Sequence, residues 1–115
     1  MPKREQRLFF KDIIESIENI ENYTFKMSYE DFKADRKTID AVVRNLEIIG
    51  EAVKNIMEQN KKIHSDIDWK GIAGMRDKLT HGYFGVDPKV VWQTTQQRLP
   101  ELKNKIQDIL KKLDK

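Results

Sequence analysis

Apolar residues recur along most of this chain at intervals of three and four positions, the spacing that gathers them on one face of an α-helix. The first such stretch predicts a helix over residues 4–23. Its expected apolar face consists of Leu8, Ile13, Ile17 and Ile20, with Phe9 and Phe10 beside it. Ser28 then has the character of a helix N-cap, and Asp31 follows three positions later. A short helix is therefore predicted through Phe32 to about Ala34.

The clearest periodicity in the chain predicts a second long helix over residues 36–59. Its apolar positions are Ile39, Val42, Val43, Leu46, Ile49, Val53, Ile56 and Met57. Gly50 lies inside this stretch at a cost of about 1 kcal/mol relative to alanine. A glycine at such a place often lets another backbone come close. Residues 60–66 are expected to form a loop.

A third helix is expected to begin after Asp66 or Asp68, either of which could cap it. Its predicted core residues are Trp69, Ile72, Met75 and Leu79. Gly71 and Gly74 weaken it as a free helix, so packing must hold it in place. Gly82 and Gly85 mark its expected end.

Asp87 followed by Pro88 is typical of a new helix start, a capping carboxylate before a proline at the first helical position. The last helix should then continue to Leu113, with a kink at Pro100. Its apolar face comprises Val91, Thr95, Leu99, Leu102, Ile106, Ile109 and Leu113. Because strand-type alternation is missing throughout, we predict an all-α fold. The expected architecture is a four- to five-helix antiparallel bundle forming one domain over residues 1–115.

Composition indicates the expected cellular location and excludes some kinds of site, but it does not identify the function. The chain has 115 residues, a formal charge of +3 and no cysteine, which excludes disulfides and cysteine-based zinc sites. No apolar run reaches the length of a membrane span, so a cytoplasmic protein is expected. Basic residues gather near both ends of the chain, at Lys3, Arg4, Arg7 and Lys11 and at Lys103, Lys105, Lys111, Lys112 and Lys115. We interpret them as solvated helix faces rather than a phosphate-binding track.

The chain has two histidines, and only one has promising neighbours. His64 falls in a polar stretch and is interpreted as a surface residue. His81 follows Arg76 by five positions and precedes Tyr83 by two. RNA carries its own nucleophile, the 2′-hydroxyl, whose proton a neutral imidazole can accept near pH 7. A guanidinium can bind the phosphate and stabilise its developing charge, so this chemistry needs no metal.

Helical geometry favours a contact between Asp77 and His81 but not a direct approach of Arg76 to His81. Asp77 and His81 are four positions apart and share a helix face, so Asp77 could orient the ring or simply pair with it. Arg76 and His81 are five positions apart, about 140° around an ideal helix. The site could therefore need a distorted helix end or a second subunit, whose histidine could protonate the leaving 5′-oxygen. From chemistry alone, a helix-ending histidine beside a surface arginine is the more common arrangement.

The stretch from Arg76 to Tyr83 resembles the Arg-x4-His-x-Tyr motif of HepT-type HEPN proteins. The segment from Arg44 to Ala52 resembles the second-helix signature of that family, and residues 91–94 also fit its pattern. This resemblance extends over nearly the whole chain. It implies a helical homodimer in which arginines and histidines of both subunits line a shared cleft.

The resemblance also implies an endoribonuclease that acts as the toxin of a toxin–antitoxin pair. Arg76 and His81 would be its catalytic pair. The implied antitoxin is an MntA-type minimal nucleotidyltransferase that transfers AMP from ATP to Tyr83. Asp77 stands where many relatives have asparagine, and its carboxylate would repel a phosphate. Glu51 could line the cleft or be a surface residue.

Two other functions remain open on the sequence. Some HEPN proteins are non-catalytic nucleotide- or substrate-binding companions of a nucleotidyltransferase, and Arg76 would then bind a phosphate without cleavage. A structural dimerisation bundle is the third possibility.

Overall fold

A computed structural model describes the backbone of residues 3–80 and 86–114, and the side chains of residues 5–75 and 86–114. Within these ranges the regular elements are all helical, which confirms the predicted all-α class for the described part of the chain. They are α1 (Lys3–Tyr23), α2 (Tyr29–Ala34), α3 (Arg36–Lys54), α4 (Glu58–Ile63), α5 (Trp69–Thr80), α6 (Pro88–Gln93), the π-helical turn η1 (Thr94–Arg98) and α7 (Leu99–Leu113). No described helix is long and apolar enough to cross a membrane.

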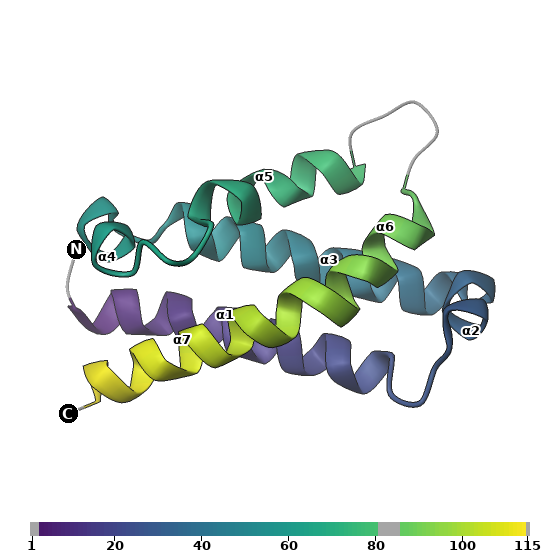
Figure 1. The fold of residues 1–115 in the computed structure, drawn as a ribbon, viewed down its shortest axis with the longest axis horizontal. Helices are drawn as coiled ribbons and strands as arrows, with labels where there is room; N and C mark the ends of the chain where they lie inside the picture. The colour runs from purple at the N-terminus through teal and green to yellow at the C-terminus, as the bar shows by residue number, and fades with distance from the viewer. Residues whose placement is uncertain (1–2, 81–85, 115) are drawn as a thin grey trace.

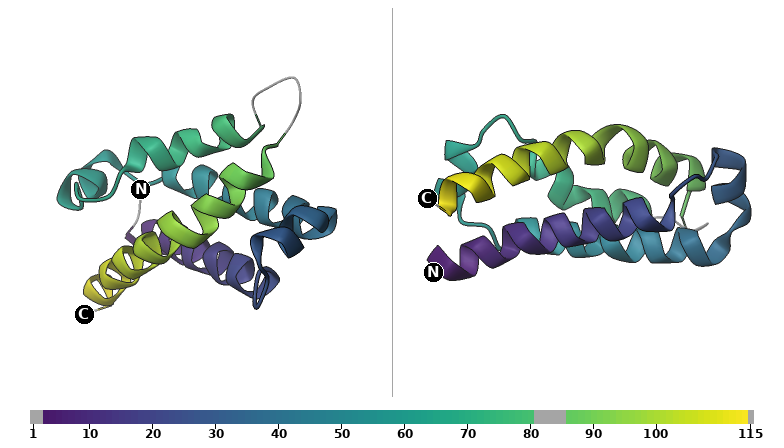
Figure 2. Two further views of the ribbon diagram at one scale, coloured as in Figure 1. Left: turned by 45° about the vertical axis from the view of Figure 1, so that its right-hand side comes forward. Right: turned by 90° about the horizontal axis from the view of Figure 1, so that it is seen from below.

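The four long helices, α1, α3, α5 and α7, pack as antiparallel neighbours (Figure 1). Helices α1 and α3 lie side by side in the centre, α5 packs against α3, and α7 packs against α1. Figure 2 shows that α5 and α7 diverge from each other on the same side of the α1–α3 pair. The short α2 links α1 to α3 and also contacts α6.

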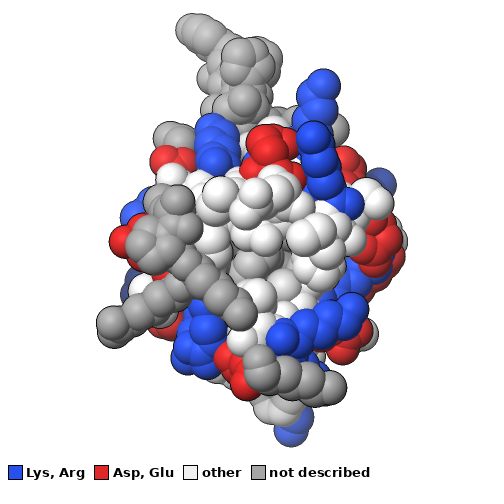
Figure 3. All heavy atoms as spheres, turned by 90° about the vertical axis from the view of Figure 1, so that its left-hand side faces the viewer, with Lys and Arg blue, Asp and Glu red and all other residues white. Residues whose placement is uncertain are grey.

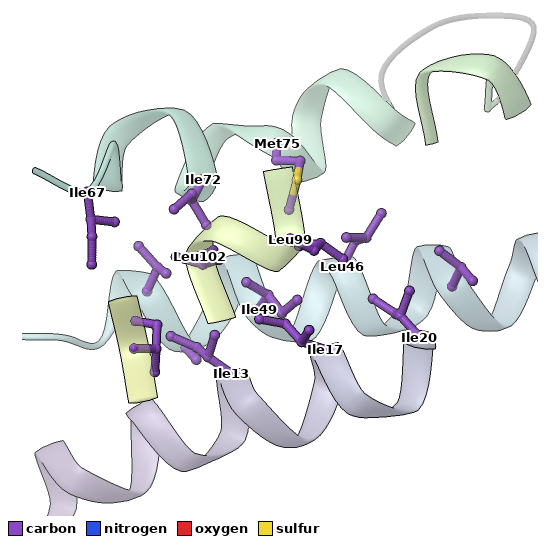
Figure 4. Packing of buried hydrophobic residues seen from close by; sticks show 14 of the residues in the cluster. Ile13, Ile17, Ile20, Leu46, Ile49, Ile67, Ile72, Met75, Leu99 and Leu102 are labelled. Carbon is purple, nitrogen blue, oxygen red and sulfur yellow. The ribbon is translucent and has the colours of Figure 1, made fainter. Parts of the chain in front are cut away.

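Buried apolar side chains from these helices form a single cluster (Figure 4). Helix α1 contributes Phe10, Ile13, Ile17 and Ile20, all at most 1% exposed. The expectation that Leu8 belongs to this face was wrong, because Leu8 is 48% exposed. Phe10 precedes Ile13 by three positions and continues the stripe, whereas Leu8 precedes it by five and lies about 140° away.

The predicted start of α2 is confirmed in atomic detail. The Ser28 hydroxyl accepts the Asp31 amide and the Asp31 carboxylate accepts the Ser28 amide, each at 3.1 Å, which completes a capping box. Asp35 then caps α3, because its carboxylate accepts both the amide and the hydroxyl of Thr38. These hydrogen bonds lower the pKa of Asp35.

The second long helix ends earlier than expected. It stops at Lys54 rather than continuing to residue 59, and part of the predicted loop at 60–66 is helical in α4. Gln6, which is 3% exposed, stabilises the break. Its Nε2 donates to the Asn55 carbonyl at 3.2 Å, and its Oε1 accepts the Met57 amide at 2.8 Å. A side chain of α1 thus provides hydrogen-bond partners for backbone groups that lack helical partners where α3 ends.

The last helix carries an irregularity where a proline kink was predicted. Asp87 caps α6 by accepting the Lys89 amide at 3.0 Å, with Pro88 at the first position, as expected. The chain then forms the π turn η1 just before Pro100, and the Leu99 amide bonds to the Thr94 carbonyl five positions back. A proline lacks an amide donor and crowds the carbonyl four positions before it, so a widened turn accommodates Pro100 without ending the helix.

Candidate active site

Helix α5 carries the first part of the predicted catalytic motif. The backbone of Arg76 and Asp77 lies in the second half of this helix. His81 and Tyr83 lie outside the described residues, one and three positions after Thr80, the last residue of α5. The described structure therefore fixes the helix that presents Arg76.

The start of α5 is held by Trp69, which is 8% exposed. Its indole Nε1 donates to the carbonyls of Lys61 and His64, at 3.2 and 3.0 Å, and so ties α5 to the end of α4. The ring also packs against Phe10 of α1, with centroids 6.4 Å apart at a tilt of 60°. One tryptophan thus joins α5 to two other helices.

Asp68 is the N-cap of this helix, one of the two residues predicted for the role. Its Oδ1 accepts the Gly71 amide at 3.0 Å, while its Oδ2 pairs with the Arg98 guanidinium at 3.4 Å. Asp66, the other candidate, instead pairs with Lys105 of α7 at 3.7 Å. Arg98 was missed by sequence reasoning, because nothing local to the π turn indicates that its side chain reaches the start of another helix.

The middle of α5 packs into the core through Ile72 and Met75, which are buried as predicted. Met75 directly precedes Arg76, so the backbone of Arg76 begins from a packed position. Beside it, a cavity of about 330 Å³ lies between α5 and α7. Its apolar lining consists of Ile67, Ile72, Met75, Leu99 and Leu102, and Figure 4 shows these side chains pointing toward one another.

Glu51, the possible cleft-lining residue, is exposed on α3. It lines a hollow of about 470 Å³ between α1 and α3. That hollow also contains Asp12, Arg44 and Glu47, with Phe9 and Ile48 as apolar neighbours. Carboxylates therefore outnumber cations around Glu51, a setting that disfavours direct contact with a phosphate.

His64 is half-buried at the end of α4 rather than fully solvated. Burial is the main cause that lowers its pKa, and the nearby Lys112 ammonium lowers it further. Its backbone carbonyl accepts the Trp69 indole, which gives this residue a structural part in anchoring α5.

Three of the basic residues near the chain ends, Arg7, Lys103 and Lys105, form ion pairs in the described structure. Arg7 pairs with Asp114 at 2.6 Å, and this hydrogen bond lowers the pKa of Asp114. Lys103 pairs with Glu21 at 2.8 Å. Figure 3 shows the corresponding end of the bundle, where cationic and anionic side chains are interspersed around an uncharged centre. This pattern agrees with solvated helix faces rather than a phosphate track.

Among the described side chains, no three or more His, Asp or Glu residues are arranged to hold a metal ion. The side chains of Asp77 and His81 are not among those described.

Comparison with known proteins agrees with the resemblance to the HepT family. The family model described as ribonuclease HepT-like matches residues 13–109. A probable ribonuclease HepT of Thermococcus cleftensis is 49% identical over 109 residues, which cover 95% of this chain and 99% of that protein. A putative RNase of Methanocaldococcus jannaschii is 45% identical over 114 residues, covering 99% of this chain and 94% of the relative.

A third relative, a putative RNase of Caldanaerobacter subterraneus, is 43% identical over 106 residues, with coverage of 92% and 95%. No solved structure gives a significant match. The family match covers the second half of α1, all of α3 and α5 and most of α7, and thus includes the helix that carries Arg76. The expected activity, that of an endoribonuclease, is confirmed at the level of the family, and the chain belongs to the HepT-like ribonuclease family.

Proposed function

We propose that this chain is a metal-independent endoribonuclease in which Arg76 and His81 form the catalytic pair. The observation that carries the proposal is the fixed position of α5. Asp68 and Trp69 hold its start, and Met75 is buried immediately before Arg76. A helix held by packing and hydrogen bonds in this way suits a residue that must meet a phosphate in one geometry.

The proposed reaction uses the nucleophile that RNA already contains. The His81 imidazole accepts the 2′-hydroxyl proton, and the 2′-oxygen attacks the adjacent phosphorus. The bond from phosphorus to the 5′-oxygen breaks, and that oxygen takes up a proton. The Arg76 guanidinium stabilises the negative charge that develops on the phosphoryl oxygens.

We further propose that two copies of the chain complete the site. Each copy has one histidine in the motif, and the reaction needs both a base and an acid. A second His81 from the partner copy would protonate the leaving 5′-oxygen. Sedimentation should give a dimer at micromolar concentration, and a stable, active monomer would contradict this part of the proposal.

Within a cell, we propose that this activity is a toxin neutralised by a nucleotidyltransferase of the MntA type in the cytoplasm. Transfer of AMP to Tyr83 would place a phosphate close to Arg76 in sequence. That charge could occupy the guanidinium and repel the RNA backbone, so modification would inhibit cleavage without a change of fold.

The chemistry of the products tests the proposed reaction. Cleavage should leave a 2′,3′-cyclic phosphate or 3′-phosphate and a free 5′-hydroxyl, and it should spare DNA. A single 2′-deoxy substitution at the cleaved nucleotide should block cleavage there. Products with 5′-phosphates would contradict the mechanism. RNA left intact under all conditions would favour the non-catalytic binding companion.

A further inference from the structure

The connection between α1 and α2 presents an aromatic ring to solvent. Phe25 is 72% exposed, the largest value among the described apolar side chains that are exposed. The ammonium of the next residue, Lys26, lies 5.4 Å from the centroid of this ring. A ring and a cation adjacent at a surface match the two parts of a nucleotide, since bases stack on aromatic side chains and phosphates pair with lysine.

The residues on either side hold this pair in place. Thr24 is 8% exposed, and both its amide and its hydroxyl donate to the Ile20 carbonyl, at 3.0 and 2.9 Å. Met27 packs partly against the core, and its amide donates to the Thr24 carbonyl at 3.0 Å. Phe25 and Lys26 therefore lie at the tip of a turn whose two ends are fixed.

Lys26 occupies a backbone conformation that a lysine seldom adopts. Its φ is +61°, in the left-handed region, and no other described non-glycine residue has a positive φ. Glycine would meet this requirement without steric cost. The left-handed φ costs stability at a lysine, the exposed Phe25 ring adds little to the core, and the solvent-exposed contact of the ammonium with the ring is a weak one, so packing explains this pair poorly.

The turn lies at the end of the bundle toward which α5 runs. Figure 1 places the α1–α2 connection and the C-terminal end of α5 in the same half of the long axis, away from both chain termini, with the end of α5 at the top of the view and the connection at the bottom. The second panel of Figure 2 shows the same arrangement from below. Across that axis the molecule measures 30 by 21 Å. An RNA strand of several nucleotides bound at the end of α5 can therefore extend to this turn.

We propose that Phe25 and Lys26 form a binding subsite for single-stranded RNA, in which a base stacks on the Phe25 ring and Lys26 contacts a flanking phosphate. The subsite rests on the proposed ribonuclease function and extends it, because it would hold the substrate several nucleotides away from the cleaved bond. Stacking on a ring accepts any base, so the subsite should favour longer substrates without selecting a sequence.

Cleavage of two RNA substrates tests the proposal. Phe25→Ala should raise KM for a decanucleotide by roughly tenfold, as expected for the loss of one base–aromatic stack. The same variant should leave kcat for the decanucleotide and kcat/KM for a dinucleotide unchanged. Phe25→Trp should retain the wild-type KM. Ile63→Ala is a matched control, because Ile63 is 71% exposed on α4. Its loss should change the kinetic constants for neither substrate.

Lys26→Gly separates binding from folding. It should raise Tm by about 2–6 °C by removing the left-handed strain, yet weaken RNA binding at least twofold. Binding is measured by fluorescence anisotropy with a decanucleotide made non-cleavable by 2′-O-methyl groups. An unchanged KM and affinity in Phe25→Ala, with an active wild type, would overturn the subsite. A wild type that binds this probe in a Phe25-dependent manner but never cuts RNA would support the subsite and refute the proposed function.

Discussion

The carboxylate of Asp68 lies over Gly71, three positions later in the first turn of α5. Its Oδ1 accepts the Gly71 amide, and a β-carbon on Gly71 would come within 3.0 Å of both carboxylate oxygens and of the carbon between them. The cap that starts α5 therefore requires the absence of a side chain at position 71. At Gly74, one turn further on, such a carbon would meet nothing within 4 Å beyond its chain neighbours and the adjacent backbone of its own helix.

This difference predicts opposite outcomes for two similar substitutions. Gly74→Ala should raise the free energy of unfolding by about 0.5–1 kcal/mol, because alanine favours the helix. Gly71→Ala should give no such gain, since displacing Asp68 removes a cap worth about 1 kcal/mol. Urea unfolding measures both. In an Asp68→Ala background, Gly71→Ala should become stabilising, and an equal gain from both substitutions in the native background would contradict the packing.

Gln6 should be among the most sensitive polar residues of the fold. Gln6→Ala removes the buried side chain that bonds to the Met57 amide and the Asn55 carbonyl, which should lower the free energy of unfolding by about 1–3 kcal/mol. Gln59→Ala, at an exposed position of α4, is the matched control and should change it by less than about 0.5 kcal/mol. Similar small effects from both would mean that Gln6 does not stabilise the α3–α4 break.

The sequence predicts the parts of this fold that local chemistry determines. The limits of α1, the capping box at Ser28 and the start of α6 at Asp87 follow from side chains within one turn of each other. The end of α3 does not, because the apolar spacing continues through Ile56 and Met57 while the break depends on Gln6, about fifty positions away in the chain. Long-range hydrogen bonds of this kind leave no periodic signal.

The sequence likewise predicts only part of the candidate site. The resemblance to the HepT-type motif points to Arg76, His81 and Tyr83, and the apolar spacing predicts that the first of them lies on a helix. The sequence also points to Asp68 as a possible cap. It cannot reveal Arg98, because the contact with Asp68 spans thirty positions and depends on the packing of the π turn beside α5.

His64 should make stability depend on pH near neutrality. Its pKa is lowered in the folded state, so the folded protein binds fewer protons than the unfolded chain. The free energy of unfolding should therefore fall as the pH drops below about 6.5, the ordinary histidine value. His64→Asn should remove this part of the dependence, as followed by urea unfolding between pH 8 and 5.5.

A different pH range separates this effect from that of the carboxylates. Asp35 and Asp114 also have lowered pKa values, but the stability they contribute is lost only as the pH falls through the carboxyl range, below about 4. If wild type and His64→Asn show the same dependence between pH 8 and 5.5, the assignment to His64 is wrong.

Tyr83→Phe should uncouple the ribonuclease from its proposed inhibitor. The phenylalanine variant lacks the hydroxyl that would accept AMP, so incubation with the nucleotidyltransferase and ATP should leave its activity intact. Wild type under the same treatment should gain the mass of one AMP at Tyr83 and lose activity. Peptide mass spectrometry locates the modification, and inhibition of both forms would show that the control point lies elsewhere.

The most direct test of the catalytic assignment is RNA cleavage by wild type, Arg76→Ala and His81→Ala, each with and without EDTA. Wild type should cut RNA equally well in the chelator, while each variant should lose at least about a hundredfold in kcat, the contribution expected of one acid–base or charge-stabilising group. Circular dichroism should show that both variants keep the helical fold. Wild-type activity in His81→Ala, or loss of activity in EDTA, would contradict the account.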